Sequence, residues 1–455
     1  MSAVEVLDAH LARIRRWNPA VNAVVTLNAD RARDQAQAAD AALDRGETWG
    51  PLHGVPFTAK DQFSTAGVRT TYALPGYDDF VPAADAPQIR RLKDAGAILM
   101  GKTNLPFAAY DWQCQNPTFG RANNPWDLAC TPGGSSGGSA AALAAGFAPL
   151  ELGADVGGSL RVPAHFCGVA SLRPTERGPL RGIRPPDRPA TVRHIAVAGP
   201  MARTVEDLQL AWAALSGSAD AETASAPAAA SLRIAVTPAL GDVPVDTDTQ
   251  RVLRTALGAW RAAGCTVERR PAPLDLEDAF DTWGRIQGVE LTAGFPGPLR
   301  HAPLKHLVWQ GYVRSQYGSL AGRMARGARL GPRGYFAALD AREDLADSLD
   351  IFLGDWDLWV TPVAATPAFT HRRIGTDLDI EGVPVPYALP LAPYNCPTAV
   401  TGHPILTLPA GQSADGRPIG LQVHARRGAD AALLAAGRRL EDALGNVPSL
   451  APLGA

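Results

Sequence analysis

Thr131-Pro-Gly-Gly-Ser-Ser-Gly-Gly138 is a glycine-rich loop that leads into a helix of small residues, expected over Ser139–Gly146. An apolar strand is expected over residues 149–155, and a second glycine-serine turn, Gly157-Gly-Ser159, follows it at once. Glycine and serine are also the ordinary composition of a flexible linker. A linker is not usually followed by a buried helix, a strand and a second such turn, so this order of segments favours a structured site.

Helix and strand patterns alternate on both sides of this segment. Ser2 and Glu5 have capping-box spacing at the start of an amphipathic helix that is expected to end near Pro19. The other expected elements are helices at residues 30–45, 84–96, 249–263 and 429–444, and strands at residues 53–60, 97–100, 232–236, 265–269, 357–362, 405–409 and 419–424. This alternation predicts a layered α/β fold.

The domain organisation follows from length and from two changes in composition. The 455 residues allow about three average domains or one large enzyme domain. The Ala/Ser/Glu/Thr tract at 216–231 is predicted to be a linker-like loop between two halves of one fold. The segment 283–345, rich in arginine, glycine and aromatic residues, is interpreted as a helical insert that lines a substrate pocket. Residues 54–210 contain both glycine-serine turns and are predicted to form the catalytic core.

Composition argues against several classes of partner. The formal net charge is −2 at pH 7 and the basic residues are scattered, so no nucleic-acid partner is expected. The longest stretch of small apolar residues has about 12 residues, fewer than the roughly 20 that span a bilayer, and the first residues are too charged for a secretory signal. Five cysteines, none in a C-x-x-C pair, indicate neither a disulfide framework nor a zinc site. We therefore predict a cytoplasmic protein with no membrane or nucleic-acid partner.

The residues around the two turns suggest nucleophilic chemistry. Gly157 and Gly158 allow successive backbone N–H groups to converge on one point, as in a nest for a developing oxyanion, and Ser159 follows them. Lys60 stands at the far end of an otherwise apolar strand, although lysine is usually solvated. As a base it must be neutral near pH 7, which requires burial that lowers its pKa by about three units, or roughly 4 kcal/mol.

Other chemistries remain open at this point. Gly133-x-Ser135-x-Gly137 matches the nucleophile elbow of α/β-hydrolases, which would make Ser135 the nucleophile of a Ser-His-acid triad, but irregular loop is expected where an elbow needs a strand. A phosphate-binding loop is not supported, because no Gly-Lys-Ser/Thr follows the glycines. No histidine has metal-binding spacing, so His165 and His403 are interpreted as structural and no metal is expected.

The arrangement of these motifs resembles the amidase-signature family over most of the chain. The matching segments are Gly133-Gly-Ser-Ser-Gly-Gly-Ser139, Gly153-Ala-Asp-Val-Gly-Gly-Ser-Leu-Arg-Val-Pro163, Phe166-Cys-Gly168, Gly54-Val-Pro-Phe-Thr-Ala-Lys-Asp61, Gly101-Lys-Thr-Asn104, Asn123-Asn-Pro-Trp126, Gly199-Pro-Met-Ala-Arg-Thr-Val-Glu-Asp207 and Gly420-Leu-Gln422. The resemblance implies one large α/β domain with a central mixed sheet covered by helices on both faces. It also places the start of the chain inside the family's first helix region, so a preceding segment is expected to be missing.

The resemblance further implies a Ser-cisSer-Lys triad and no cofactor. In this sequence the triad consists of Ser159 as nucleophile, Ser135 as proton relay and Lys60 as base. The residues implied in stabilising the oxyanion are the amides of Val156, Gly157, Gly158 and Ser159, and those implied in substrate binding are Ala109, in the acyl pocket, and Ser135. Three departures from the family pattern are Ala154 for threonine, Arg173 for lysine and Phe107 for glutamate, and Phe107 is expected to change the pocket wall.

The implied function is hydrolysis of the C–N bond of small aryl or alkyl amides through an acyl-enzyme. Carbamate (urethane) or ester hydrolysis by the same triad is an alternative. A second alternative is the glutaminase component of a tRNA-dependent amidotransferase, which would act only with its partner. The expected ligand is therefore a small amide, carbamate or ester, and self-association as a homodimer is left open.

Overall fold

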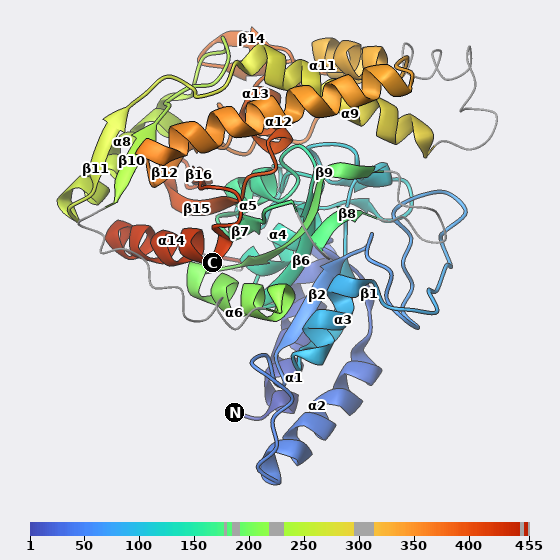
Figure 1. Cartoon of the computed structure of the whole chain (residues 1–455). Coiled ribbons are helices and arrows are strands. Elements are labelled where there is room, and N and C mark those ends of the chain that lie inside the picture. Colours follow the sequence, from blue (N-terminus) through green and yellow to red (C-terminus); the bar gives the residue numbers. More distant parts are fainter. Residues whose placement is uncertain (177–179, 184–191, 218–231, 295–313, 446–449, 454–455) are drawn as a thin grey trace.

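The computed structural model describes residues 1–176, 180–183, 192–217, 232–294, 314–445 and 450–453 (Figure 1). Most of the tract at 216–231 lies outside these residues, so its interpretation as a linker stays a prediction. Within the described part of the chain, no helix combines the length and the apolar character needed to cross a membrane.

A mixed sheet of 12 strands runs through the molecule. Its strand order is β1-β3-β2-β6-β9-β7-β15-β16-β12-β10-β11, with β8 paired to β9. In chain order the strands are β1 Val24–Leu27, β2 Pro56–Lys60, β3 Ile98–Thr103, β6 Leu150–Asp155, β7 Ala170–Arg173, β8 Arg181–Ile183, β9 Val192–Ala202, β10 Arg233–Val236, β11 Thr266–Arg269, β12 Leu358–Pro362, β15 Ile405–Gln412 and β16 Pro418–His424. Parallel pairs at β3-β2-β6 and β12-β10-β11 are joined by antiparallel ones, which confirms the predicted mixed α/β sheet.

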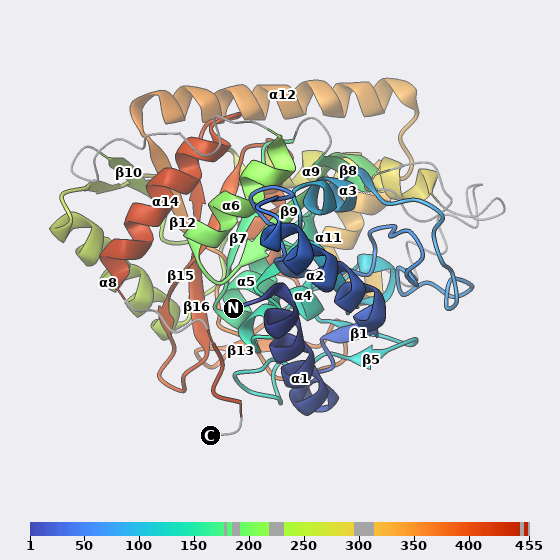
Figure 2. The same ribbon diagram turned by 90° about the horizontal axis from the view of Figure 1, so that it is seen from below.

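One face of the sheet is covered by helices with apolar stripes. These helices are α3 Pro87–Asp94, α6 Val205–Ser216, α8 Thr247–Ala262 and α14 Asp430–Leu444. In α8, Asp246 caps the N-terminus by accepting from two backbone amides, and the residues that follow at helical spacing, such as Val252 and Trp260, are buried. Figure 2 shows α6 and α14 beside each other, and their side chains share one apolar core with α8 and the strands.

The opposite face carries two layers of helices. The inner helices are α4 Gly137–Ala144, α5 Arg161–Cys167 and α13 Ala392–Val400, and the outer ones are α9 Leu276–Ala293, α11 Arg314–Gly327 and α12 Pro332–Asp355, which lie together in Figure 1. Every residue of α4 is buried, because glycine, serine, alanine and one leucine allow the sheet to approach closely. Three of these helices fall wholly or partly in the segment predicted to be a helical insert, of which 295–313 lie outside the described residues.

The N-terminal helices pack at the β1 end of the sheet. They are α1 Ala3–Val21 and α2 Ala29–Asp44, and the predicted capping box of Ser2 and Glu5 is present. Helix α1 continues past Pro19, where the sequence predicts its end, and stops at Asn22 in a left-handed conformation. Two short hairpins complete the described structure: β4 Gln115–Asn116 with β5 Gly120–Arg121, and β13 Leu378–Ile380 with β14 Val383–Val385.

Candidate active site

The parallel pairing of β2 with β6 brings two of the predicted site segments to one edge of the sheet. Phe57 pairs with Leu150, and Ala59 pairs with Leu152. Because parallel strands end at the same edge, Lys60 at the end of β2 lies near the turn 156–159 that follows β6. The sheet thus joins residues that are about 100 positions apart in the sequence.

The Ser135 loop is fastened to the same edge by Ser136. The Ser136 N–H donates to the carbonyl of Ser159 at 3.1 Å, and its Oγ donates to the carbonyl of Ala154 at 3.2 Å. The peptide bond between Gly134 and Ser135 is cis. A Cβ on Gly134 would stand 2.3 Å from the Asp111 carbonyl oxygen, so only glycine fits there. Loop residues, not a strand, precede Ser135, so the strand–turn–helix setting of an α/β-hydrolase elbow is absent from this described segment.

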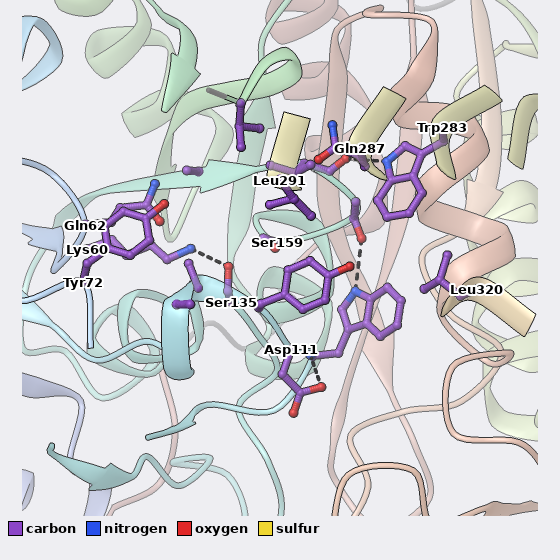
Figure 3. Close-up of a pocket in the computed structure, with 18 residues that line it drawn as sticks. Lys60, Gln62, Tyr72, Asp111, Ser135, Ser159, Trp283, Gln287, Leu291 and Leu320 are labelled. Atoms are coloured by element: carbon purple, nitrogen blue, oxygen red, sulfur yellow. Dashed lines mark hydrogen bonds between the residues drawn. The ribbon is translucent and has the colours of Figure 1, made fainter. Parts of the chain in front are cut away.

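Lys60 and Ser135 are in direct contact inside the protein. The Lys60 side chain is buried, and its Nζ lies 2.6 Å from Oγ of Ser135 (Figure 3). Burial lowers the pKa of Lys60 to about 7, against the opposing influence of Cys114, Asp155 and Glu151. The prediction that Lys60 is deeply buried beside a hydroxyl is therefore confirmed. The lowered pKa favours the uncharged amine, the form that can accept a proton.

The Asp155 carboxylate accepts hydrogen bonds from two backbone amides of the glycine turn. Its Oδ1 accepts from the Gly158 N–H at 3.0 Å, and its Oδ2 accepts from the Leu160 N–H at 3.0 Å. Burial alone would raise the pKa of Asp155, but the guanidinium groups of Arg161 and Arg173 and these hydrogen bonds hold it well below its usual value. Asp155 is thus a fixed anion under the turn.

The hydrogen bond from Gly158 corrects one part of the predicted oxyanion hole. An amide has a single hydrogen, and that of Gly158 is committed to Asp155, so the prediction that all four amides of the turn are open donors is wrong for Gly158. Gly158 has a φ of 103°, and a Cβ there would stand 2.6 Å from Asn395. Glycine is therefore required at this position for shape, whereas the amides of Gly157 and Ser159 have no other partner among the described residues.

A single pocket joins the predicted site residues. It contains about 740 Å³ of empty space, part of it open to solvent, and Lys60, Ser135 and Ser159 all line it (Figure 3). The structure also places Ala109, Val156 and Gly157 in its wall. The remaining wall is mostly aromatic or aliphatic, from Tyr72, Ala108, Tyr110, Trp112, Ala154, Val192, Trp283, Leu291 and Leu320, with Gln62, Asp111 and Gln287 as polar members.

Asp111, the carboxylate of the pocket lining, is already engaged. Its Oδ1 accepts from the Tyr387 hydroxyl at 2.7 Å and from the backbone N–H of Trp112 at 2.7 Å. Lys60 is held by Ser135, and no arginine belongs to the described pocket wall. The polar groups of the described wall are thus already engaged in part, and most of its remaining surface is apolar.

Phe107 does not line this pocket, so the expectation that it changes the pocket wall is wrong. Its side chain is 39% exposed and lies in a neighbouring surface groove with Arg372 and Arg373. The backbone of the short helix η1, Phe107–Ala109, turns Ala108 and Ala109 toward the main pocket instead.

The two histidines predicted to be structural have partners in the core. His165 is wholly buried between the Gly420 N–H and the Thr366 carbonyl, and burial lowers its pKa to about 4. His403 lies 3.1 Å from a carboxylate oxygen of Asp350. Within the described ranges, no group of three or more histidine, cysteine or acidic side chains is arranged to hold a metal ion.

Two tryptophans contact the glycine turn in a way that the sequence does not reveal. Trp283 of α9 donates its indole N–H to the Val156 carbonyl at 3.0 Å, and Trp112 donates to the Gly157 carbonyl at 3.1 Å. In the sequence, Trp283 stands out only as an aromatic residue of the insert. A motif search could not have found these contacts, because the acceptors are backbone atoms far away in the chain.

With this fold and site in view, the chain can be placed among known proteins. Residues 5–434 match the family described as Amidase, and the chain belongs to this amidase-signature family. An acylamidase from Rhodococcus erythropolis is 32% identical over 447 residues, which cover 95% of this chain and 90% of the relative. A subunit of the glutamyl-tRNA(Gln) amidotransferase from Moorella thermoacetica is 32% identical over 475 residues, covering 97% of this chain and 93% of the relative.

The solved structures agree with this placement. The crystal structure of a bacterial aryl acylamidase of the amidase-signature family matches with a TM-score of 0.79 at 26% identity, covering 100% of this chain and 96% of that chain. The protein is accordingly an amidase-signature hydrolase that acts on the carbon–nitrogen bond of amides.

Proposed function

We propose that this protein hydrolyses small, uncharged aryl or alkyl amides, with Ser159 as nucleophile, Ser135 as proton relay and Lys60 as base. The observation that carries the proposal is the 2.6 Å contact between the buried Lys60 amine and the Ser135 hydroxyl, in the pocket that Ser159 also lines. A lysine with a pKa of about 7 is matched to general-base catalysis near neutral pH.

In the first half of the reaction, neutral Lys60 accepts the proton of Ser135 while Ser135 accepts that of Ser159. The Ser159 oxygen forms a bond to the substrate carbonyl carbon, and the carbonyl oxygen becomes an oxyanion. The amides of residues 156, 157 and 159 are the proposed donors to this oxyanion. Each such donor contributes on the order of 3 kcal/mol to lowering the barrier.

In the second half, the proton returns through Ser135 to the leaving nitrogen as the C–N bond breaks. Water then attacks the ester carbon of the acyl-enzyme, giving its proton to the same relay, and Ser159 regains its proton as the acid product departs. The cycle balances without a metal or an organic cofactor, because the relay only moves protons.

The pocket wall supports the proposed substrate class. Trp283, Leu291 and Leu320 supply apolar surface from the insert (Figure 3), and Tyr110 also lines the pocket. The similarity to an acylamidase and to an aryl acylamidase agrees with this chemistry. Carbamates and esters present the same carbonyl to the same relay, so we include them as alternative substrates.

A glutaminase that supplies ammonia to a partner is the second candidate, because components of glutamyl-tRNA(Gln) amidotransferases are relatives at similar identity. Free glutamine carries an ammonium and a carboxylate, each of which needs a counter-charge when it is bound. The described pocket wall offers Asp111, which already has two donors, and no arginine. This difference favours the free-standing amidase.

The test is turnover by the purified chain on a panel of anilides, carbamates, esters and glutamine. We expect the anilides to be cleaved best, and Ser159→Ala to abolish turnover with an unchanged melting temperature. Ser348→Ala on the exposed face of α12 is the matched control and should retain full activity. Wild-type activity in Ser159→Ala would refute the triad. An isolated chain that turns over no member of the panel would favour the amidotransferase function, which needs a partner.

A further inference from the structure

Two consecutive peptide groups of the glycine turn are held by indole rings. The carbonyl of Val156 accepts from the Trp283 indole, which is labelled in Figure 3, at 3.0 Å. The next carbonyl, that of Gly157, accepts from the Trp112 indole at 3.1 Å. The two tryptophans are 4% and 7% exposed, so water competes little for either hydrogen bond. They come from different parts of the chain: Trp283 from α9, and Trp112 from the loop after η1.

Fixing a carbonyl also fixes the N–H on the other side of the same peptide group. A trans peptide is planar, and its C=O and N–H point in opposite directions. The bond from Trp283 to the Val156 carbonyl therefore directs the N–H of Gly157 away from the indole. In the same way, the bond from Trp112 to the Gly157 carbonyl directs the N–H of Gly158, which Asp155 accepts.

The two peptide groups differ in how many of their ends are engaged. The group between Gly157 and Gly158 is held at both ends, by Trp112 and by Asp155. The group between Val156 and Gly157 is held at its carbonyl by Trp283, while its N–H has no partner in the described structure. The peptide group between Val156 and Gly157 therefore combines a fixed orientation with an open N–H donor, which is what an oxyanion hole requires.

We propose that Trp283 is a positioning residue that orients the Gly157 N–H toward the developing oxyanion. This inference rests on the proposed Ser159 mechanism and adds to it a residue from the insert, outside the signature segments. The indole also packs against the turn, since a Cβ on Gly157 would stand 3.1 Å from Cζ2 of Trp283. Without the indole N–H, the peptide group loses the bond that fixes its rotation, and its N–H is no longer held in one direction.

The test is Trp283→Phe, which keeps an aromatic ring in the pocket wall and removes the donor. We expect kcat to fall about 10- to 100-fold with KM changed less than about threefold, because the lost orientation matters only when charge develops. A trifluoromethyl ketone, which forms a tetrahedral oxyanion adduct with a serine, should bind more weakly by about the same factor as kcat falls. An unreactive substrate analogue should bind as before.

Trp260→Phe is the matched control. Trp260 is also buried and donates its indole N–H to a backbone carbonyl, that of Leu440 at 3.1 Å, in the core on the other face of the sheet. This variant should lose stability to a similar extent while kcat stays within about twofold, because only folding depends on that bond. A merely structural role for Trp283 would make the two variants behave alike.

Trp112→Phe should lower kcat less than Trp283→Phe does, since Asp155 still holds the other end of its peptide group. If the smaller ring of Trp283→Phe disturbs packing, replacing the indole of Trp283 by benzothiophene keeps the bicyclic shape without a donor and should give the same loss of kcat. An unchanged kcat in that variant would overturn the proposal while leaving the triad intact. Activity that survives in Ser159→Ala would refute the mechanism itself.

Discussion

Lys60 and Lys102 are two fully buried lysines on neighbouring parallel strands, yet their surroundings differ. Lys102 of β3 donates to the Phe63 carbonyl at 2.7 Å and to the Thr70 hydroxyl at 2.8 Å, and its amine lies 3.6 Å from a carboxylate oxygen of Asp61. Lys60 of β2 contacts a single hydroxyl, that of Ser135, and faces the pocket.

The difference shows that burial alone does not make a lysine reactive. Burial lowers the pKa of both residues, but Asp61 opposes it at Lys102, whose pKa is about 8, while that of Lys60 is about 7. Lys102 donates its hydrogens to fixed acceptors. Lys60 contacts Ser135 in the pocket, so the surrounding acceptors distinguish a structural lysine from the proposed base.

The largest expected effect is the loss of activity caused by the substitution Lys60→Met. Removing the base should lower kcat/KM by about 10³-fold or more, near the upper end of what general-base catalysis contributes. Stability should be kept or raised, because a buried amine with an unfavourable charged form is replaced by an apolar side chain of similar length. Steady-state kinetics and thermal unfolding measure the two effects. A destabilised variant that retains activity would reverse the assignment of the two lysines.

Lys102→Met should have the opposite result. It leaves the buried carboxylate of Asp61 without its cation, and we expect the free energy of unfolding to fall by about 3–5 kcal/mol. Urea denaturation measures this loss, and activity per folded molecule should remain. The double variant with Asp61→Asn should recover part of the stability, since no unpaired charge then remains. Equal losses in the single and double variants would show that the ion pair is not the cause.

The smallest effect concerns pH. Because Lys60 must be neutral to act and its pKa is about 7, kcat/KM should fall about tenfold per pH unit below pH 7 and level off above it. For stability, the unfolded chain binds a proton on this lysine up to about pH 10.5 and the folded chain only up to about pH 7. The contribution of Lys60 to the unfolding free energy therefore rises with pH across that window. A rate that is flat between pH 5 and 7 would contradict this assignment.

The proposed reactive residues stand out in the sequence because they belong to short contiguous motifs. Ser135 and Ser159 stand in glycine turns that have few other uses, and Lys60 interrupts an apolar strand. The buried state of Lys102 could not be predicted in this way. It depends on Asp61, which lies on a different segment of the chain and meets it only when β2 and β3 pair.

Backbone partners account for the other omissions. Trp112 and Trp283 bond to carbonyls 45 and 127 positions away, which no side-chain pattern encodes. The donor role expected for the Gly158 amide failed because Asp155, three residues earlier, accepts its hydrogen. Strand β9 was not predicted because Gly199-Pro200 normally indicates a loop, although Pro200 pairs opposite Leu152 in the sheet.

Helix α9 presents Trp283, Gln287 and Leu291 to the pocket at a spacing of four residues, so they share one face. These positions lie more than 100 residues beyond Ser159, outside the segments that contain the proposed triad. During divergence of substrate range, Gln287 and Leu291 can change the shape of the wall without altering the proton relay. Trp283 has no such freedom, because the ring that lines the pocket also donates to the Val156 carbonyl, and a substitution there changes both the wall and that hydrogen bond.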